Sequence, residues 1–196
     1  VVLFEAENRL GGHTNTIHLG PEFGPDAGMP VDTGFIVYND ETYPHLIRFF
    51  QDLGITGSPT GMSFSFSDPA RNLAYAGSGL NGLFAQRRQA LDPGFWIFLN
   101  AILRFNRRAS RDLENGIPPD LTLKEYLDRL RVSNRLRQDY LGPMVQAIWS
   151  ASETEAADYP ARSFIRFFAN HGLLSRPGTI QWRYLEGGSQ TYVQAF

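Results

Sequence analysis

The first sixteen residues, VVLFEAENRLGGHTNT, constrain the fold more than any other stretch of the chain. A short apolar run with β-branched members ends on an acid, Glu5, and this pattern predicts a buried strand over residues 1–5. Arg9 and the pair Gly11-Gly12 follow at once. Glycines at such a place let the backbone turn tightly and approach a bound group closely. The stretch therefore predicts a strand and a tight turn of an α/β domain.

An acid at the end of such a strand has a specific use in dinucleotide-binding folds. There it accepts hydrogen bonds from the adenosine ribose, and the phosphate-binding glycines precede it by roughly 20 residues. In this sequence those glycines would lie upstream of Val1. On this residue alone two interpretations of Glu5 stay open. It is a ribose ligand whose preceding strand, glycine turn and helix lie outside the sequence, or it is simply the polar end of a strand.

The spacing of apolar residues and the positions of turn-forming residues predict the next strands and helix. Strands are expected over residues 14–19 and 30–38, and a helix follows with Pro44 in its first turn. Asp40 is expected to cap that helix, and Gly54 to end it.

Beyond that helix, apolar residues alternate with serines from Met62 to Ser67, and Leu73–Ala76 follows a turn, which predicts a hairpin. From about residue 80 to 171 the pattern is helical. The expected helix boundaries are Asp92-Pro93, Thr122 with Glu125, Ser133, a kink or break at Gly142-Pro143, Ser152 with Glu155, and Pro160 to Asn170. The apolar side of the first of these helices is expected to hold Phe95, Phe98, Leu99, Ile102, Leu103 and Phe105. The tail QWRYLEGGSQTYV predicts a strand, a Gly-Gly turn and a helix.

Composition narrows the class of protein. The chain is 42% apolar and 19% charged, which is typical of a folded globular protein of one domain or parts of two. A net charge of −2 gives no reason to expect nucleic acid as a partner. There is no apolar run of about 18 residues, so no membrane span is expected, and we predict a cytoplasmic protein.

Metal and hydrolytic chemistry find no support in the sequence. There is no cysteine, and the four histidines lack the spacing of a helical zinc motif, so no metal site is expected. His13 lies within the Gly-Gly turn, either against a cofactor or as a surface histidine. Trp149 and Trp182 line a substrate cavity or belong to the core. No spacing singles out a catalytic side chain.

Several segments together resemble one enzyme family. EAENRLGGHTNT resembles the E-x-x-x-R-x-G-G-x-x-x-T pattern of the flavin-containing amine oxidase superfamily, and VDTGFIVYN (residues 31–39) resembles its D-x-G segment. The segments YAGSGLNGLFAQRRQ, GPMVQAIWSAS, PARSFIRFFANHGLL and QWRYLEGGSQTYV are similar to a bacterial branch of FAD-dependent, amine-oxidase-like proteins. The resemblance covers essentially the whole chain.

The resemblance implies FAD as cofactor. It implies that Glu5 binds the ribose, that Arg9, Gly11 and Gly12 lie on the pyrophosphate side, and that the backbone of Gly34 and Phe35 lies near the flavin. Asp32 would be structural. Core packing remains the alternative for the Phe35 side chain.

The implied fold class is α/β with three parts. Residues 1–58 would be a partial, Rossmann-like FAD-binding domain, which is incomplete because the N-terminal G-x-G-x-x-G of such a domain is not among them. Residues 59–178 would form a mostly helical substrate-binding region with a small antiparallel β element. Residues 179–196, with Gly187-Gly188-Ser189, would return to the FAD-binding domain.

The function implied is that of a FAD-dependent oxidoreductase that removes a hydride from a C–N or C–C bond of a small-molecule substrate. Two alternatives stay open. The chain is a non-catalytic folded fragment that binds no cofactor by itself and self-associates through apolar surface. Or the parent protein is a nicotinamide-dependent dehydrogenase, which requires a complete dinucleotide fingerprint upstream.

Overall fold

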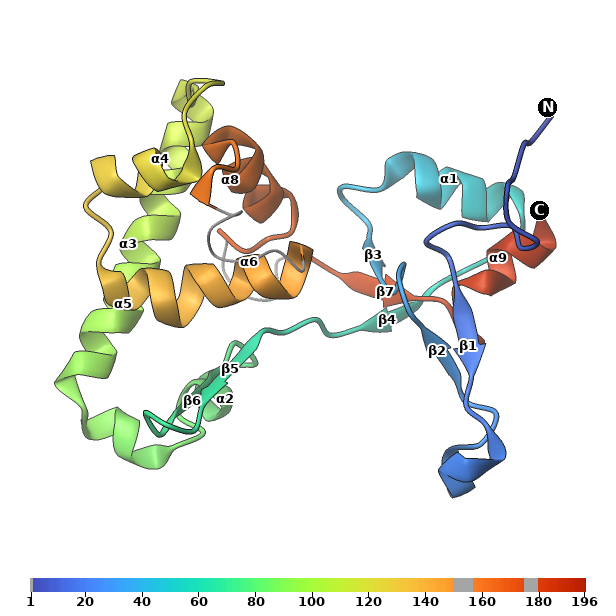
Figure 1. The fold of residues 1–196 in the computed structure, drawn as a ribbon, viewed down its shortest axis with the longest axis horizontal. Helices are drawn as coiled ribbons and strands as arrows, with labels where there is room; N and C mark the ends of the chain where they lie inside the picture. Colours follow the sequence, from blue (N-terminus) through green and yellow to red (C-terminus); the bar gives the residue numbers. More distant parts are fainter. Residues whose placement is uncertain (1, 150–156, 175–179) are drawn as a thin grey trace. The chain divides into compact units, whose positions relative to one another are not determined.

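The fold is known from a computed structural model that describes residues 2–149, 157–174 and 180–196. The chain is mixed α/β, and the strands of its described part form small antiparallel sheets. It divides into two compact units, one of residues 1–62 with 180–196 and one of residues 63–179 (Figure 1).

The first unit combines the opening and the closing segments of the chain. Its elements are β1 (Thr16–His18), η1 (Pro21–Asp26), β2 (Pro30–Asp32), β3 (Tyr38–Asn39), α1 (Pro44–Asp52), β4 (Ser58–Thr60), β7 (Trp182–Tyr184) and α9 (Gln190–Ala195). β1 and β2 pair antiparallel, with Thr16 opposite Asp32. β7 lies between β3 and β4 and pairs antiparallel with both. The tail therefore supplies the central strand of a sheet whose edges come from the opening.

The predicted strand over residues 1–5 is wrong, because residues 2–5 form no strand. The side chains of Val2, Leu3 and Phe4 are 78%, 62% and 91% exposed. A strand is held by a neighbour that takes up its N–H and C=O groups, and among the described residues nothing pairs with this run. Apolar composition alone does not order such a segment.

Helix α1 ends as predicted but begins differently. Gly54 follows it at φ +71°, and the N–H of Ile55 donates to the carbonyl of Phe50 at 2.8 Å, which satisfies a terminal carbonyl of the helix. Asp40 does not cap the helix, contrary to the prediction. Its carboxylate instead accepts hydrogen bonds from Nε of Arg183 at 2.7 and 3.0 Å. The helix begins at Pro44 with Tyr43 in the N-cap position, so Asp40 lies upstream of the cap and pairs with the distant strand β7.

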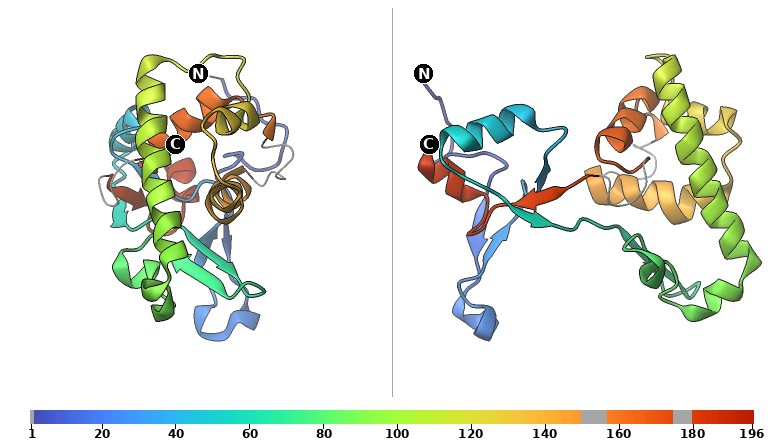
Figure 2. Two further views of the ribbon diagram at one scale, coloured as in Figure 1. Left: turned by 90° about the vertical axis from the view of Figure 1, so that its left-hand side faces the viewer. Right: turned by 180° about the vertical axis from the view of Figure 1, so that it is seen from behind.

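The second unit is mostly helical. Its elements are β5 (Ser65–Asp68), β6 (Leu73–Ala76), α2 (Leu80–Leu83), η2 (Arg87–Leu91), α3 (Pro93–Asn115), α4 (Leu123–Arg129), α5 (Asn134–Leu136), the π-helical η3 (Arg137–Leu141), α6 (Gly142–Trp149) and α8 (Ala161–Asn170). β5 and β6 form the predicted hairpin, and α2 lies beside β6 (Figure 2). α8 packs against both α3 and α4.

The predicted helix starts at Asp92, Thr122 and Ser133 are confirmed. Asp92 Oδ1 accepts the N–H of Gly94 at 2.8 Å, and Ser133 Oγ accepts the N–H of Leu136 at 3.3 Å. Thr122 and Glu125 form both hydrogen bonds of a capping box. The pattern at Ser152 and Glu155 lies outside the described residues.

Aromatic rings dominate the core of the second unit. Phe95, Phe98, Phe164 and Phe168 are at most 2% exposed. The predicted burial of Leu103 on α3 is wrong, since its side chain is 54% exposed. At about 100° per residue, Leu103 points roughly 140° away from Phe98, outside the buried stripe.

The chain passes through Gly142-Pro143 without a break in the helix, and the predicted irregularity takes the form of the π-helical η3 just before it. Pro143 has no N–H, so it cannot pair with the carbonyl of Asp139 four residues earlier. The buried hydroxyl of Tyr75 donates to that carbonyl at 2.6 Å. A side chain from β6 therefore satisfies an acceptor that proline leaves open.

Replacing Tyr75 by phenylalanine tests this arrangement. Tyr75→Phe removes only the hydroxyl and leaves the Asp139 carbonyl without that donor, so we expect the free energy of unfolding to fall by about 1–3 kcal/mol. Urea denaturation measures it. Tyr159→Phe is the control, because Tyr159 is 39% exposed. Equal stability of the two variants would show that the hydroxyl does not matter.

Buried tyrosines also make the second unit sensitive to alkali. Burial raises the pKa of Tyr140 from 10.0 to about 12. The fold favours the protonated phenol, so its contribution to stability is complete below pH 10 and is lost as the pH rises through about 12. Compared with the wild type, Tyr140→Phe should lose about 2 kcal/mol less stability between pH 9 and pH 12. Denaturant titrations at a series of pH values measure the difference, and parallel pH profiles would contradict it.

Candidate cofactor site

The turn after residue 8 is closed by its own groups. Arg9 donates from Nη1 to the carbonyl of Thr14 at 2.8 Å and from Nη2 to that of Gly12 at 3.0 Å. The N–H of Thr14 donates to the carbonyl of Gly11 at 2.9 Å. Gly11 and Gly12 have φ of +113° and +55°, which side chains rarely adopt. Arg9 thus shapes the turn and holds a guanidinium at its edge.

A second segment crosses this turn at Gly34. The N–H of Phe35 donates to the carbonyl of His13 at 3.1 Å. A Cβ on Gly34 would lie 2.3 Å from the same oxygen, so only glycine allows the crossing. The His13 side chain is exposed, as a surface histidine would be.

The ring of Phe35 belongs to the core of the first unit. It is half-buried and packs at the edge of the cluster of Tyr38, Phe50 and Leu185. Its centroid lies 6.3 Å from that of Tyr192, edge to face. The core interpretation therefore holds for the side chain, while the backbone of Phe35 serves the crossing.

The carboxylate of Asp32 fastens the closing segment to the opening one. It accepts hydrogen bonds from the Thr16 hydroxyl at 2.6 Å, the Ser189 amide at 2.8 and 3.0 Å, and the Ser189 hydroxyl at 2.7 Å. Thr16 Oγ1 in turn accepts the N–H of Gln190 at 3.0 Å. Asp32 is structural, as the resemblance implies. The resemblance placed Ser189 in the returning segment but did not identify it as the partner of Asp32.

Two further contacts complete this junction. Gly188 has φ +91°, and a Cβ there would lie 2.3 Å from Cγ2 of Thr16. The hydroxyl of Tyr192 on α9 is hydrogen-bonded to Oγ1 of Thr14. The only sequence signal for this closure was the Gly-Gly turn at 187–188, and nothing in the sequence identified Tyr192.

Five of the six predicted cofactor residues come together. Arg9, Gly11 and Gly12 form the turn, and Gly34 with Phe35 crosses it through the His13 carbonyl. Glu5 does not join them in the described contacts: its side chain is exposed, and its Oε1 accepts the N–H of Glu7 at 2.9 Å.

The two tryptophans considered for a substrate cavity belong to cores instead. Trp182 is 6% exposed, and the ring of Trp149 packs against Tyr159, Phe164 and Phe167.

The two glycines of the turn differ in the space around them. A Cβ on Gly11 would lie 2.7 Å from the Thr14 carbonyl, but a Cβ on Gly12 would meet nothing within 4 Å. The turn thus packs closely on one side and leaves bare backbone at Gly12. Bare backbone beside an arginine is an arrangement that accommodates phosphate oxygens.

A comparison with protein families now decides the class. The family model described as flavin containing amine oxidoreductase matches residues 1–186. The chain belongs to this family. The resemblance in the sequence is thereby confirmed, and flavin-dependent oxidoreductase chemistry is the activity that the family indicates. None of the curated proteins matches the chain with significant similarity. Across the residues that the structure describes, no helix has the length and apolar character needed to cross a membrane.

Asp32→Asn tests the junction between the ends of the chain. The change replaces one accepting oxygen by an amide that faces the donor N–H of Ser189, so we expect the first unit to lose about 2–3 kcal/mol of stability. Hydrogen exchange of peptides spanning residues 14–18 and 187–195 should speed up together. Asp26→Asn is the control, because Asp26 is exposed and its carboxylate has no partner among the described residues. Unchanged protection in Asp32→Asn would refute the role of this carboxylate.

Proposed function

We propose that this chain forms part of a FAD-dependent oxidoreductase that removes a hydride from a C–N or C–C bond of a small-molecule substrate. The observation that carries the proposal is the turn at Gly11-Gly12, which is closed by Arg9, crossed at Gly34 and open at Gly12. In this family the flavin supplies the hydride acceptor.

In this proposal different residues contact different parts of FAD. Backbone amides of the turn and the Arg9 guanidinium face the pyrophosphate and balance its charge. Glu5, whose carboxylate is exposed, binds the ribose hydroxyls. The backbone at Gly34 and Phe35 lies against the flavin ring. Residues 1–58 and 179–196 are then the FAD-binding part, and residues 59–178 the substrate-binding region.

The alternative function also has an observation in its favour. Residues 2–5 form no strand and Val2, Leu3 and Phe4 are exposed, so Glu5 is not held in place by a sheet. A ribose ligand without a fixed position loses affinity to the entropy of ordering it. On this interpretation the 196-residue chain binds no FAD by itself. Self-association and a cytoplasmic location stay predictions.

A single substitution at Gly12 tests the cofactor proposal. Gly12→Ala adds a methyl group in open space, so the fold should lose only the left-handed φ cost of about 1–2 kcal/mol. The same methyl group would occupy the place of the pyrophosphate, and FAD affinity should fall at least about tenfold. Gly54→Ala is the matched control, since Gly54 also has a positive φ and open space around its Cβ position.

The measurement is a titration of the purified chain with FAD, followed by flavin fluorescence and by melting temperature. Wild type and Gly54→Ala should bind alike, and FAD in about hundredfold excess over Kd should stabilise the wild type by about 2.7 kcal/mol. Wild-type protein that neither binds FAD nor melts higher with it supports the non-catalytic alternative. Binding of NAD without binding of FAD would favour a nicotinamide dehydrogenase.

A further inference from the structure

A pocket lies within residues 63–179, and the residues that line it are not those of the candidate cofactor site. It has a volume of about 550 Å³ and lies where the hairpin turn, η2, the start of α3 and η3 meet. Its lining contains three arginines, Arg71, Arg88 and Arg135, and two carboxylates, Asp92 and Asp139. Among the described residues of this lining Leu73 is the one aliphatic residue, and a lining so rich in charged and polar groups does not suit a purely hydrocarbon ligand.

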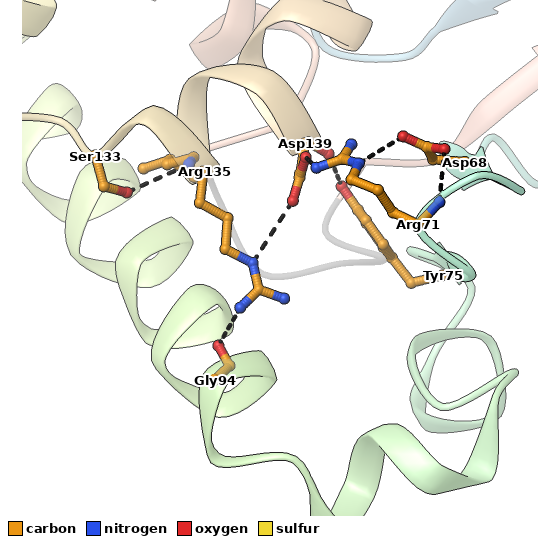
Figure 3. Close-up of polar contacts among 8 residues, drawn as sticks. Asp68, Arg71, Tyr75, Gly94, Ser133, Arg135 and Asp139 are labelled. Carbon is orange, nitrogen blue, oxygen red and sulfur yellow. Dashed lines mark hydrogen bonds and ion pairs between the residues drawn. The ribbon is translucent and has the colours of Figure 1, made fainter.

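Asp139 fixes two of the arginines that line the pocket. Its side chain is 1% exposed, with Arg71 Nη1 at 2.6 Å and Arg135 Nε at 3.5 Å (Figure 3). One buried carboxylate thus has two guanidinium neighbours. Nε of Arg71 also donates a hydrogen bond to the carboxylate of Asp68 at 2.6 Å. Nη1 of Arg135 donates to the carbonyl of Gly94 at 2.8 Å. These hydrogen bonds hold the two guanidinium groups in fixed orientations in the absence of a ligand.

The two carboxylates of the pocket are already occupied by protein donors. Asp92 caps α3 through the N–H of Gly94, and Asp139 has its two arginines. Neither carboxylate is left over for a cation. Among the described residues of the lining no negative charge is therefore left over, and the three guanidinium groups outnumber the two carboxylates.

Arg88 supplies the positive charge that remains. Its Nη2 donates to the carbonyl of Asn72 and, at 3.4 Å, to Oε1 of Gln86. Among the residues that the structure describes, no carboxylate lies within ion-pair distance of Arg88. Its Nε and Nη1 have no partner in that part of the chain either. This guanidinium is exposed and positioned, and it lacks a counter-charge.

Gln89 indicates that the ligand carries a hydrogen-bond donor as well as a negative charge. It lines the pocket and is only 5% exposed, and its Nε2 donates to Oε1 of Gln86 at 3.0 Å. Its own Oε1 is buried without a hydrogen-bond partner among the described residues. A buried acceptor without a donor costs free energy, which a hydroxyl or N–H on a ligand would recover.

We propose that this pocket binds a small molecule through one oxyanion group, a carboxylate or a phosphate, which Arg88 holds together with Arg71 and Arg135. Planar guanidinium forks match the geometry of both groups. A hydroxyl next to the oxyanion reaches Gln89.

The test is isothermal titration of the full chain with inorganic phosphate, glycolate or acetate, each against sodium chloride at equal ionic strength. We expect phosphate or glycolate to bind one to one, and whichever binds identifies the oxyanion. Glycolate carries the hydroxyl that acetate lacks, so it should bind more tightly than acetate. Equal affinities of the two acids would overturn the role of Gln89.

Two arginine variants separate the pocket from general charge. Arg88→Gln removes the arginine without a counter-charge, and affinity should fall at least about tenfold with little change in melting temperature. Arg104→Gln removes the same charge from an exposed position on α3 outside the pocket and should leave affinity within about twofold. No binding above sodium chloride, or equal losses in the two variants, would overturn the proposal. No step of this test involves FAD, so its failure leaves the proposed function untouched.

Discussion

One carboxylate holds the two ends of the chain together. Asp32 accepts hydrogen bonds from Thr16 beside it on β1 and from Ser189, 157 positions further along. All of residues 63–179 lie between the two parts of the first unit, so joining them closes a very long loop. Loop closure at this length costs entropy, and hydrogen bonds to a charged group, worth about 1.5–3 kcal/mol, are the kind that offsets it. The pairing of β7 with β3 and β4 adds to the same closure.

A second aspartate has a comparable place in the helical unit. The backbone carbonyl of Asp139 cannot pair with Pro143, which has no N–H, and accepts a hydrogen bond from the Tyr75 hydroxyl instead. The Asp139 carboxylate forms ion pairs with Arg71 and Arg135. The irregular π-helical segment and the charged pocket therefore depend on one residue. Wide helical turns are often found at functional sites because they redirect side chains that a regular helix would place elsewhere. Here the wide turn places a buried negative charge beneath two guanidinium groups.

The sequence predicted what local chemistry decides. The caps at Asp92, Thr122 and Ser133 involve partners two or three residues away, so short patterns are enough to find them. The misses have distant causes. The carboxylate of Asp40 accepts a hydrogen bond from Arg183, 143 positions away. Residues 2–5 lack a neighbouring strand in the described chain. In the candidate site, the returning segment with its Gly-Gly turn was visible in the sequence. The contacts of Ser189 and Tyr192 were not, since serine and tyrosine carry no local mark of a long-range contact.

Glycines that look alike in the sequence have different reasons to be glycine. At Gly34 and Gly188 a Cβ would collide with the opposing segment, so packing alone accounts for them. Gly12 has no such neighbour, and its φ of +55° is matched in this chain by Asn72 at +49° and Arg131 at +51°. A side chain at such a φ costs about 1–2 kcal/mol, and the described part of the chain accepts that cost at both of these residues. The internal packing of the described residues therefore does not require glycine at position 12, and in the proposed function the pyrophosphate is what requires it.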